Sequence, residues 1–166
     1  MKIAILDDYQ DAARTLDCFK LLDGHDVKVF TNSTRGLGQL AIRLAPYDAL
    51  VLIRERTALS AALLAKLPNL KIISQTGKLA GHVDVAAATA HKIAIAEGIG
   101  SPVAPAELTW ALIMAAQRKI VPYARHLQEG LWQTSSLEPA RNTLGTVLKG
   151  RTLASAAWPM ACSTRW

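Results

Sequence analysis

Between residues 72 and 118 the sequence alternates twice between a short apolar run and a helical pattern. The first run leads into a loop that contains Gly77 and Gly81, and Asp84 then precedes an alanine-rich helical segment. A second apolar run at residues 93–96 is followed by another glycine-containing loop and a long apolar helical segment. Strands that alternate with helices over such short lengths are typical of a parallel sheet with helices on its faces.

The residues before this stretch extend the same pattern. Apolar runs separated by helical spacing predict five strands, at residues 2–6, 26–30, 49–53, 71–74 and 93–96. Connections between parallel strands are nearly always right-handed, which restricts the order of the strands. The sequence therefore predicts an α/β fold of the flavodoxin-like type: a five-stranded parallel sheet in the order 2-1-3-4-5, with helices on both faces and a long C-terminal helix.

Three residues stand where helix N-caps are expected. Asp11 follows the first strand, Ser60 precedes a segment that ends before Pro68, and Asp84 follows the glycine loop. Side chains of these types accept hydrogen bonds from the free N–H groups of a first helical turn. We therefore expect one helix to begin after each of them.

The last helical segments carry more apolar side chains than a small domain normally buries. The helix expected at about residues 104–118 is almost entirely apolar between Leu108 and Ala116. A helix that is apolar on several sides is normally covered by a second domain or another subunit. We expect a homo-oligomer that forms through this helix, and a further helix that begins near Pro122 and ends at Gly130.

Composition narrows the possible classes of function. Apolar residues make up 51% of the chain and charged residues 19%, so a folded core is expected. The net charge is +6, but the basic residues are scattered without a run of five, which argues against a nucleic-acid partner. Acidic residues near the N-terminus and the lack of any apolar stretch of about 18 residues predict a cytoplasmic protein without a membrane partner. Two cysteines and four dispersed histidines predict neither a disulfide framework nor a metal site.

Four sequence pieces, through their order and spacing, point to a known family. They are LPNLKIIS, the glycine loop that ends in Val83-Asp84, AAATAHKIAIAEG, and SPVAPAELTWALIMAAQR. Together they resemble the substrate-domain half of the D-isomer-specific 2-hydroxyacid dehydrogenases, and the resemblance extends from about Met1 to Arg151. It implies a family of NAD- or NADP-dependent enzymes that reduce 2-keto acids to D-2-hydroxy acids. The implied partner is a small 2-keto or 2-hydroxy acid anion.

The resemblance also implies a substrate site in the glycine loop. In the family this loop offers backbone N–H groups to the substrate carboxylate, a role that falls here on Gly77, Lys78 and Leu79. The common G-x-G-V-D-N pattern is replaced by GKLAGH at residues 77–82. The alternative interpretation is that Gly77 and Gly81 only allow positive φ in a turn.

Arg54 follows the third predicted strand, where relatives place an arginine or a serine near the substrate. A guanidinium can bind a carboxylate through two parallel hydrogen bonds, so Arg54 is included in the predicted substrate site. The alternative is that Arg54-Glu55-Arg56 forms a solvated loop with local ion pairs.

The resemblance stops near the end of the chain. LKGRTL at residues 148–153 is where the family begins its dinucleotide-binding half, but residues 154–166 contain no glycine for a G-x-G-x-x-G turn. We interpret this as a truncated or out-of-frame end, and a natural tail that packs on the domain is the alternative. The expected parts are a flavodoxin-like substrate domain at 1–103, an interdomain or dimerisation helical segment at 104–133, and a linker with an aborted dinucleotide-binding domain at 134–166.

The catalytic Arg, Glu and His of the family have no counterparts among the 166 residues of this sequence. We therefore assign no catalytic or cofactor-binding residue. Glu107 matches the family's V-A-E sequence at the start of the long helix and is interpreted as structural. We expect the chain to bind neither NAD nor NADP tightly and to be inactive by itself.

Two other functions remain open. One is a non-catalytic interaction module that dimerises through the long helix. The other is a receiver-like domain, because Asp7-Asp8 after the first strand is similar to the acidic pair that holds magnesium in such domains. Arg54 stands where a receiver domain would have its phosphorylated aspartate, which weakens this interpretation.

Overall fold

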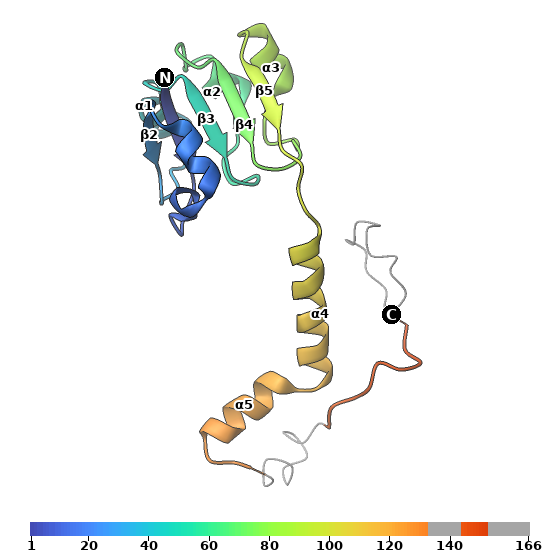
Figure 1. Cartoon of the computed structure of the whole chain (residues 1–166). Coiled ribbons are helices and arrows are strands. Elements are labelled where there is room, and N and C mark those ends of the chain that lie inside the picture. Colours follow the sequence, from blue (N-terminus) through green and yellow to red (C-terminus); the bar gives the residue numbers. More distant parts are fainter. Residues whose placement is uncertain (133–143, 153–166) are drawn as a thin grey trace. The chain divides into compact units, whose positions relative to one another are not determined.

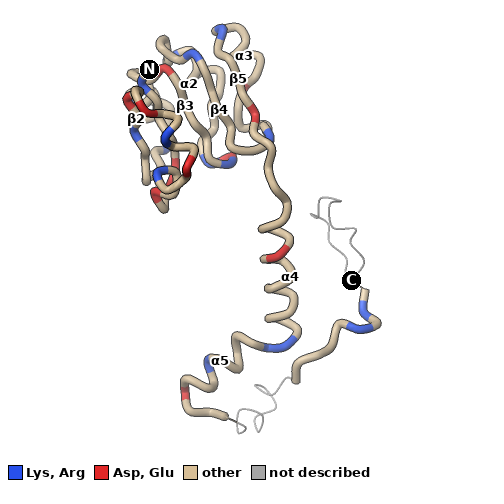
Figure 2. Tube along the Cα trace, in the orientation of Figure 1, with Lys and Arg blue, Asp and Glu red and all other residues tan. Residues whose placement is uncertain are grey.

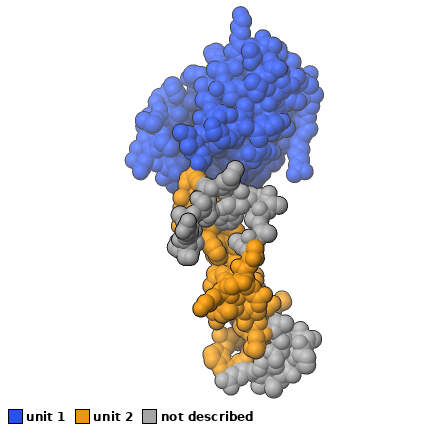
Figure 3. All heavy atoms as spheres, turned by 90° about the vertical axis from the view of Figure 1, so that its right-hand side faces the viewer, with its two compact units in different colours: residues 1–100 blue, residues 101–166 orange. Residues whose placement is uncertain are grey.

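The computed structural model describes residues 1–132 and 144–152. It divides the chain into two compact units, residues 1–100 and residues 101–166 (Figure 3). The first unit contains the sheet, and the second begins with the long helix. The tail at residues 154–166 lies outside the described residues, as does most of the linker that precedes it.

The first unit is built on a five-stranded parallel sheet (Figure 1). Its strands are β1 (Lys2–Leu6), β2 (Asp26–Val29), β3 (Ala49–Leu52), β4 (Ile72–Gln75) and β5 (Ala94–Glu97). The order is β2-β1-β3-β4-β5, which confirms the predicted fold and topology. In the register Ile5 lies beside Val51, and Ile73 lies between Leu50 and Ile95. All of these side chains except that of Leu50 are β-branched, and β-branched side chains pack well on a pleated surface, which favours strands in these runs.

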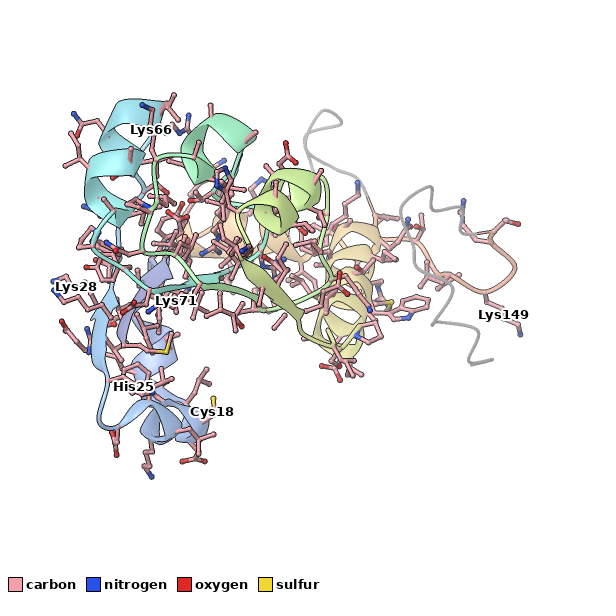
Figure 4. The ribbon with its side chains drawn as sticks, turned by 90° about the horizontal axis from the view of Figure 1, so that it is seen from above. Cys18, His25, Lys28, Lys66, Lys71 and Lys149 are labelled. Atoms are coloured by element: carbon pink, nitrogen blue, oxygen red, sulfur yellow. The ribbon has the colours of Figure 1, made fainter. Side chains whose placement is uncertain are left out.

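The core lies between the sheet and three α-helices on one face. These helices are α1 (Leu37–Leu44), α2 (Ala61–Leu64) and α3 (Val85–Ala90). Right-handed crossovers place them on this face and place the β1–β2 connection on the other. Figure 4 shows Lys66, which follows α2, and Cys18, in that connection, on opposite sides of the sheet. The best-buried large apolar side chains come from the sheet, the helices and one loop: Leu44, Leu50, Leu52, Leu59, Leu63, Leu64 and Ile73.

The β1–β2 connection is not the α-helix that the sequence predicts. It consists of two 3₁₀-helices, Ala12–Thr15 and Asp17–Leu22. The apolar residues Leu16, Phe19 and Leu22 recur every three positions, which suits a helix with about three residues per turn.

One of the three predicted N-caps forms as expected. Asp84 Oδ1 accepts a hydrogen bond from the N–H of Ala87 at 2.9 Å. Ser60 stands at the N-cap position of α2, where its backbone carbonyl accepts hydrogen bonds from the N–H groups of Leu63 and Leu64, but its side chain makes no capping hydrogen bond. Asp11, with a φ of 50°, precedes the first 3₁₀-helix, and its side chain also makes no capping hydrogen bond. A helix therefore begins after each of these two residues as predicted, but the predicted side-chain caps do not form.

The carboxylate of Asp8 makes the cap that the sequence assigns to Asp11. Its oxygens accept hydrogen bonds from the N–H groups of Ala12 at 3.1 Å and Ala13 at 2.7 Å. The N–H of Asp11 donates to the carbonyl of Asp8 at 3.0 Å, so the chain turns between the two aspartates. This turn brings Asp8, rather than Asp11, to the free N–H groups.

The second unit begins with two helices, α4 (Val103–Gln117) and α5 (Ile120–Gln128). The long helix is therefore confirmed to within one residue at each end. Lys119, with a φ of 55°, turns the chain between the two helices. α4 lies within the described residues, and none of its side chains is buried. Its residues Leu108 and Leu112 are 60% and 61% exposed. Apolar side chains of α4 thus remain uncovered.

Charged residues are dispersed along the chain in both units (Figure 2). Across residues 1–132 and 144–152, no helix is long and apolar enough to span a membrane. Within the same residues, no cluster of three or more His, Cys, Asp or Glu side chains could hold a metal ion.

Candidate anion site at the carboxyl edge of the sheet

The carboxyl ends of the strands form the edge of the sheet where ligands bind in open α/β folds. The chain leaves β1 through Asp7, with a φ of 58°, and leaves β3 through Arg54, with a φ of 57°. Left-handed backbone is uncommon for residues other than glycine and costs about 1–3 kcal/mol. Surrounding contacts must therefore hold both turns in place.

The contacts around Asp7 join three loops of this edge. Its buried carboxylate accepts hydrogen bonds from Ser33 Oγ at 2.7 Å and from Thr57 Oγ1 at 2.5 Å. Its carbonyl accepts one from Arg56 Nη1 at 2.6 Å, and the Arg56 guanidinium lies 4.6 Å from the centre of the Tyr9 ring. Asp7 therefore ties together the segments that follow β1, β2 and β3.

These contacts do not support the receiver-like interpretation of the aspartate pair. The Asp7 carboxylate is held by two hydroxyl groups, and the Asp8 carboxylate caps the first 3₁₀-helix. Both acids therefore have structural partners within the chain.

Gln75 connects the end of β4 to the segments on both sides of it. It is 2% exposed, and its Nε2 donates to the carbonyl of Arg54 at 3.3 Å. Its Oε1 accepts from His82 Nε2 at 3.1 Å, which leaves the buried Nδ1 of His82 without a hydrogen-bond partner among the described residues. A glutamine at the end of an apolar strand is a sequence signal that could have identified this contact.

The glycine loop, residues 77–84, holds a carboxylate from within the chain. Leu79 N–H donates to Glu97 Oε1 at 3.0 Å, and Lys78 Nζ lies 3.2 Å from Glu97 Oε2. The Leu79 hydrogen bond, and after it the Lys78 ammonium, hold the pKa of Glu97 below its usual range. Two of the predicted site residues therefore bind an anion, and sequence reasoning missed Glu97.

The alternative interpretation of this loop, that its two glycines only allow positive φ in a turn, is wrong. Neither Gly77 nor Gly81 has a positive φ, and a Cβ on either would meet no heavy atom within 4 Å. Gly98, which follows β5, is a crowded glycine: a Cβ there would lie 3.1 Å from the carbonyl oxygen of Gln75. Its N–H donates to the carbonyls of Gln75 at 2.9 Å and Gly77 at 3.1 Å, which brings the end of β5 close to the loop.

Arg54 lies at the same edge as the glycine loop, after the strand next to β4. Arg54, Glu55 and Arg56 are all exposed, and none of them forms an ion pair with a described residue. The alternative interpretation of residues 54–56 is a solvated loop with local ion pairs. The solvation is confirmed, and the local ion pairs are not formed. Binding of a substrate anion by Arg54, Gly77, Lys78 and Leu79 stays a prediction.

A separate cavity of about 600 Å³ lies between the 3₁₀-helices and the sheet. Its apolar lining includes Ile5, Val51 and Phe19, and Arg56 and Thr76 contribute polar groups. The predicted substrate residues do not line it. Sequence reasoning could not find this cavity because its walls come from segments that are distant in the chain.

Comparison with known proteins shows which family and which solved structures the chain resembles. The family model of the D-isomer specific 2-hydroxyacid dehydrogenase catalytic domain matches residues 3–157. D-3-phosphoglycerate dehydrogenase from Archaeoglobus fulgidus is 31% identical over 131 residues, which are 78% of this chain and 23% of that protein. D-3-phosphoglycerate dehydrogenase from Mycobacterium tuberculosis is 37% identical over 108 residues, or 63% of this chain and 20% of that protein.

Solved structures extend the comparison. Phosphoglycerate oxidoreductase from Vibrio cholerae O395 has a TM-score of 0.81 and is 53% identical, covering 92% of this chain and 47% of that chain. A structure from Ralstonia solanacearum has a TM-score of 0.80 and is 57% identical, covering 90% of this chain and 46% of that chain. This chain thus spans between a fifth and a quarter of the length of these curated relatives and about half that of these solved ones.

Proposed function

Because this chain belongs to the D-isomer-specific 2-hydroxyacid dehydrogenase family, we propose that it supplies the substrate domain of a cytoplasmic enzyme that interconverts 2-keto acids and D-2-hydroxy acids. Its ligand is a small 2-keto or 2-hydroxy acid anion. The carboxylate of that anion binds to the glycine loop, beside Arg54.

One observation supports this proposal more than any other. The loop binds a carboxylate, that of Glu97, through a backbone N–H and an ammonium group. Open space beside Gly77 lets a ligand approach the backbone closely. The exposed guanidinium of Arg54 adds a positive charge at the same edge, and a guanidinium can hold a carboxylate through two hydrogen bonds.

The glycine loop at residues 77–84 does not fit a dinucleotide. A pyrophosphate is normally held by a glycine turn at the N-terminus of a helix. Helix α3 follows the glycine loop, but the carboxylate of Asp84 already occupies the Ala87 N–H at its start. Residues 1–132 and 144–152 also contain no G-x-G-x-x-G sequence. We therefore assign substrate binding to these residues. We assign them no step that needs NAD or NADP.

A titration followed by NMR tests the proposal. We expect glyoxylate to shift the backbone amides of Gly77 and Lys78, and Arg54→Ala to weaken that binding. Arg125→Ala removes the same charge from α5 in the second unit, so it serves as the control and should leave binding unchanged. Gly77 and Lys78 amides that do not move at any glyoxylate concentration would contradict the proposal.

A second candidate function is self-association through α4. The exposed leucines of this helix favour it, because an apolar surface of this kind is typical of an interface with another chain. This function is compatible with the first.

A further inference from the structure

Glu97 is the last residue of β5, and its carboxylate lies against the loop that is proposed to bind the substrate. We propose that Glu97 is an internal carboxylate that competes with the substrate anion for the glycine loop and restricts which anions the loop accepts. This inference rests on the proposed function and adds a specificity-determining residue to it.

The two oxygens of Glu97 use two different donors. Oε1 accepts from the Leu79 N–H at 3.0 Å, and Oε2 lies 3.2 Å from Lys78 Nζ. A substrate carboxylate that binds this loop by the same groups must replace both contacts. Hydrogen bonds that involve a charged group are about twice as strong as neutral ones, so the exchange has a measurable cost.

The backbone around this contact is fixed on both sides. The Leu79 side chain packs against the hydrophobic core, which holds its N–H in place. On the other side, Gly98 N–H bonds to the carbonyls of Gln75 and Gly77, so the end of β5 stays beside the loop. The loop and the Glu97 backbone therefore have little freedom to separate.

The Glu97 side chain, by contrast, has room to leave. It is 39% exposed and its Lys78 partner is 79% exposed, so the carboxylate can rotate into water when an anion enters. A displaced Glu97 stays close to the site because its backbone is held. Its negative charge then repels a ligand that carries several charges more strongly than one that carries a single charge. The internal carboxylate therefore favours small monocarboxylates over phosphate-bearing anions.

The chain contains a matched control for this contact. At the opposite edge of the sheet, the Asp48 carboxylate accepts from the Lys2 N–H at 2.8 Å and from Lys71 Nζ at 2.9 Å. This is the same pair of donors, one backbone N–H and one lysine, at a place without a glycine loop. Asp48→Ala therefore removes an equivalent contact without changing the candidate site.

The experiment compares anion binding to the wild-type chain, Glu97→Ala, Glu97→Gln and Asp48→Ala by NMR, with glyoxylate and 3-phosphoglycerate as separate ligands. We expect Glu97→Ala to bind glyoxylate about two- to fivefold more tightly than wild type, because the competing contact is lost and exposed ion pairs of this kind contribute little. The gain for 3-phosphoglycerate should be larger, because the repulsion is removed as well. Glu97→Gln should lie between, since its amide oxygen can still accept from Leu79 N–H. Asp48→Ala should match wild type.

The outcomes separate the two proposals. Equal or weaker glyoxylate binding by Glu97→Ala overturns the internal carboxylate and leaves the anion site standing. An equal gain for both ligands overturns the specificity role. Amides of residues 77–79 that respond to neither ligand in any variant overturn the anion site together with this inference. If Glu97→Ala does not fold, Glu97→Gln must by itself bind glyoxylate more tightly than wild type, and failure to do so overturns the inference.

Discussion

Asp7, which has a buried carboxylate, joins three loops at the carboxyl edge of the sheet. It accepts hydrogen bonds from the hydroxyl groups of an exposed residue, Ser33, and of a buried residue, Thr57. A buried charge is stable only when its hydrogen-bonding capacity is met, since water cannot replace a missing donor. The two donors should therefore differ in importance.

We predict that Thr57→Val lowers the free energy of unfolding by about 1–3 kcal/mol, because it leaves one oxygen of a buried carboxylate without its donor. Ser33→Ala should cost less, since water can reach the exposed position and donate in its place. Chemical denaturation of both variants measures the difference. A Thr57→Val variant as stable as wild type would show that Asp7 does not need this hydrogen bond.

Asp48 gives a pH prediction at the same scale. The hydrogen bond from Lys2 N–H, and then that from Lys71, lower the pKa of its carboxyl group. Because the folded pKa lies below the unfolded value of about 4, the stabilisation is complete above that value and is lost as the pH falls through the folded pKa. An NMR titration should place the pKa of Asp48 below 3.8, the usual value. Lys71→Ala should raise it, and no change on that substitution would contradict the assigned cause.

At the scale of elements, the junction of β4 and β5 depends on a glycine. We predict that Gly98→Ala lowers the free energy of unfolding by about 1–3 kcal/mol, since its Cβ would lie 3.1 Å from the backbone of Gln75 and Thr76. Gly77→Ala is the control, because its Cβ meets no atom within 4 Å and its φ is not positive. Its effect should stay within about 0.5 kcal/mol. Equal losses in the two variants, measured by thermal unfolding, would refute this view of the junction.

The long helix α4 supports a prediction about assembly. Leu108 and Leu112 are four residues apart, so they lie on one side of the helix, and both are exposed. We expect the chain to self-associate at high micromolar concentration and the double variant Leu108→Glu/Leu112→Glu to be monomeric in sedimentation experiments. Gln128→Glu, which adds a charge on α5, should leave association unchanged. A wild-type chain that stays monomeric would remove this function from consideration.

The β1–β2 connection shows how an element can differ from its sequence pattern. Residues spaced by three satisfy both an α-helical and a 3₁₀ pattern over a short stretch, so spacing alone does not distinguish them. The turn between Asp8 and Asp11 decided the outcome, because it brought the Asp8 carboxylate to the first free N–H groups.

For the whole molecule, we predict that a polypeptide of these 166 residues neither binds a dinucleotide at micromolar concentration nor transfers hydride. Hydride transfer requires a nicotinamide held against the substrate carbon and an acid or base for the hydroxyl proton. Substrate binding is the only role that we propose for the residues that the structure describes, and neither of these two groups is assigned to them. Calorimetry with NADH and NADPH, and an absorbance assay with hydroxypyruvate and glyoxylate, measure both activities. Turnover above the buffer rate would disprove the prediction.

The sequence by itself determined the strands, their order and the long helix. These features follow from apolar periodicity and from the handedness of crossovers, which act on neighbouring residues or apply to almost every fold of this class. The Asp84 cap was predictable for the same reason, since its partner Ala87 is three residues away.

Tertiary structure alone decided which groups meet at the carboxyl edge. Thr57 is 50 residues from Asp7, Gln75 is 21 residues from Arg54, and Glu97 is 18 residues from Leu79. The arrangement of the strands in the sheet brings these pairs together. No periodic pattern in the sequence extends over such distances. That is why the sequence could indicate the glycine loop, while the carboxylate that occupies it became visible only after β5 was placed beside β4.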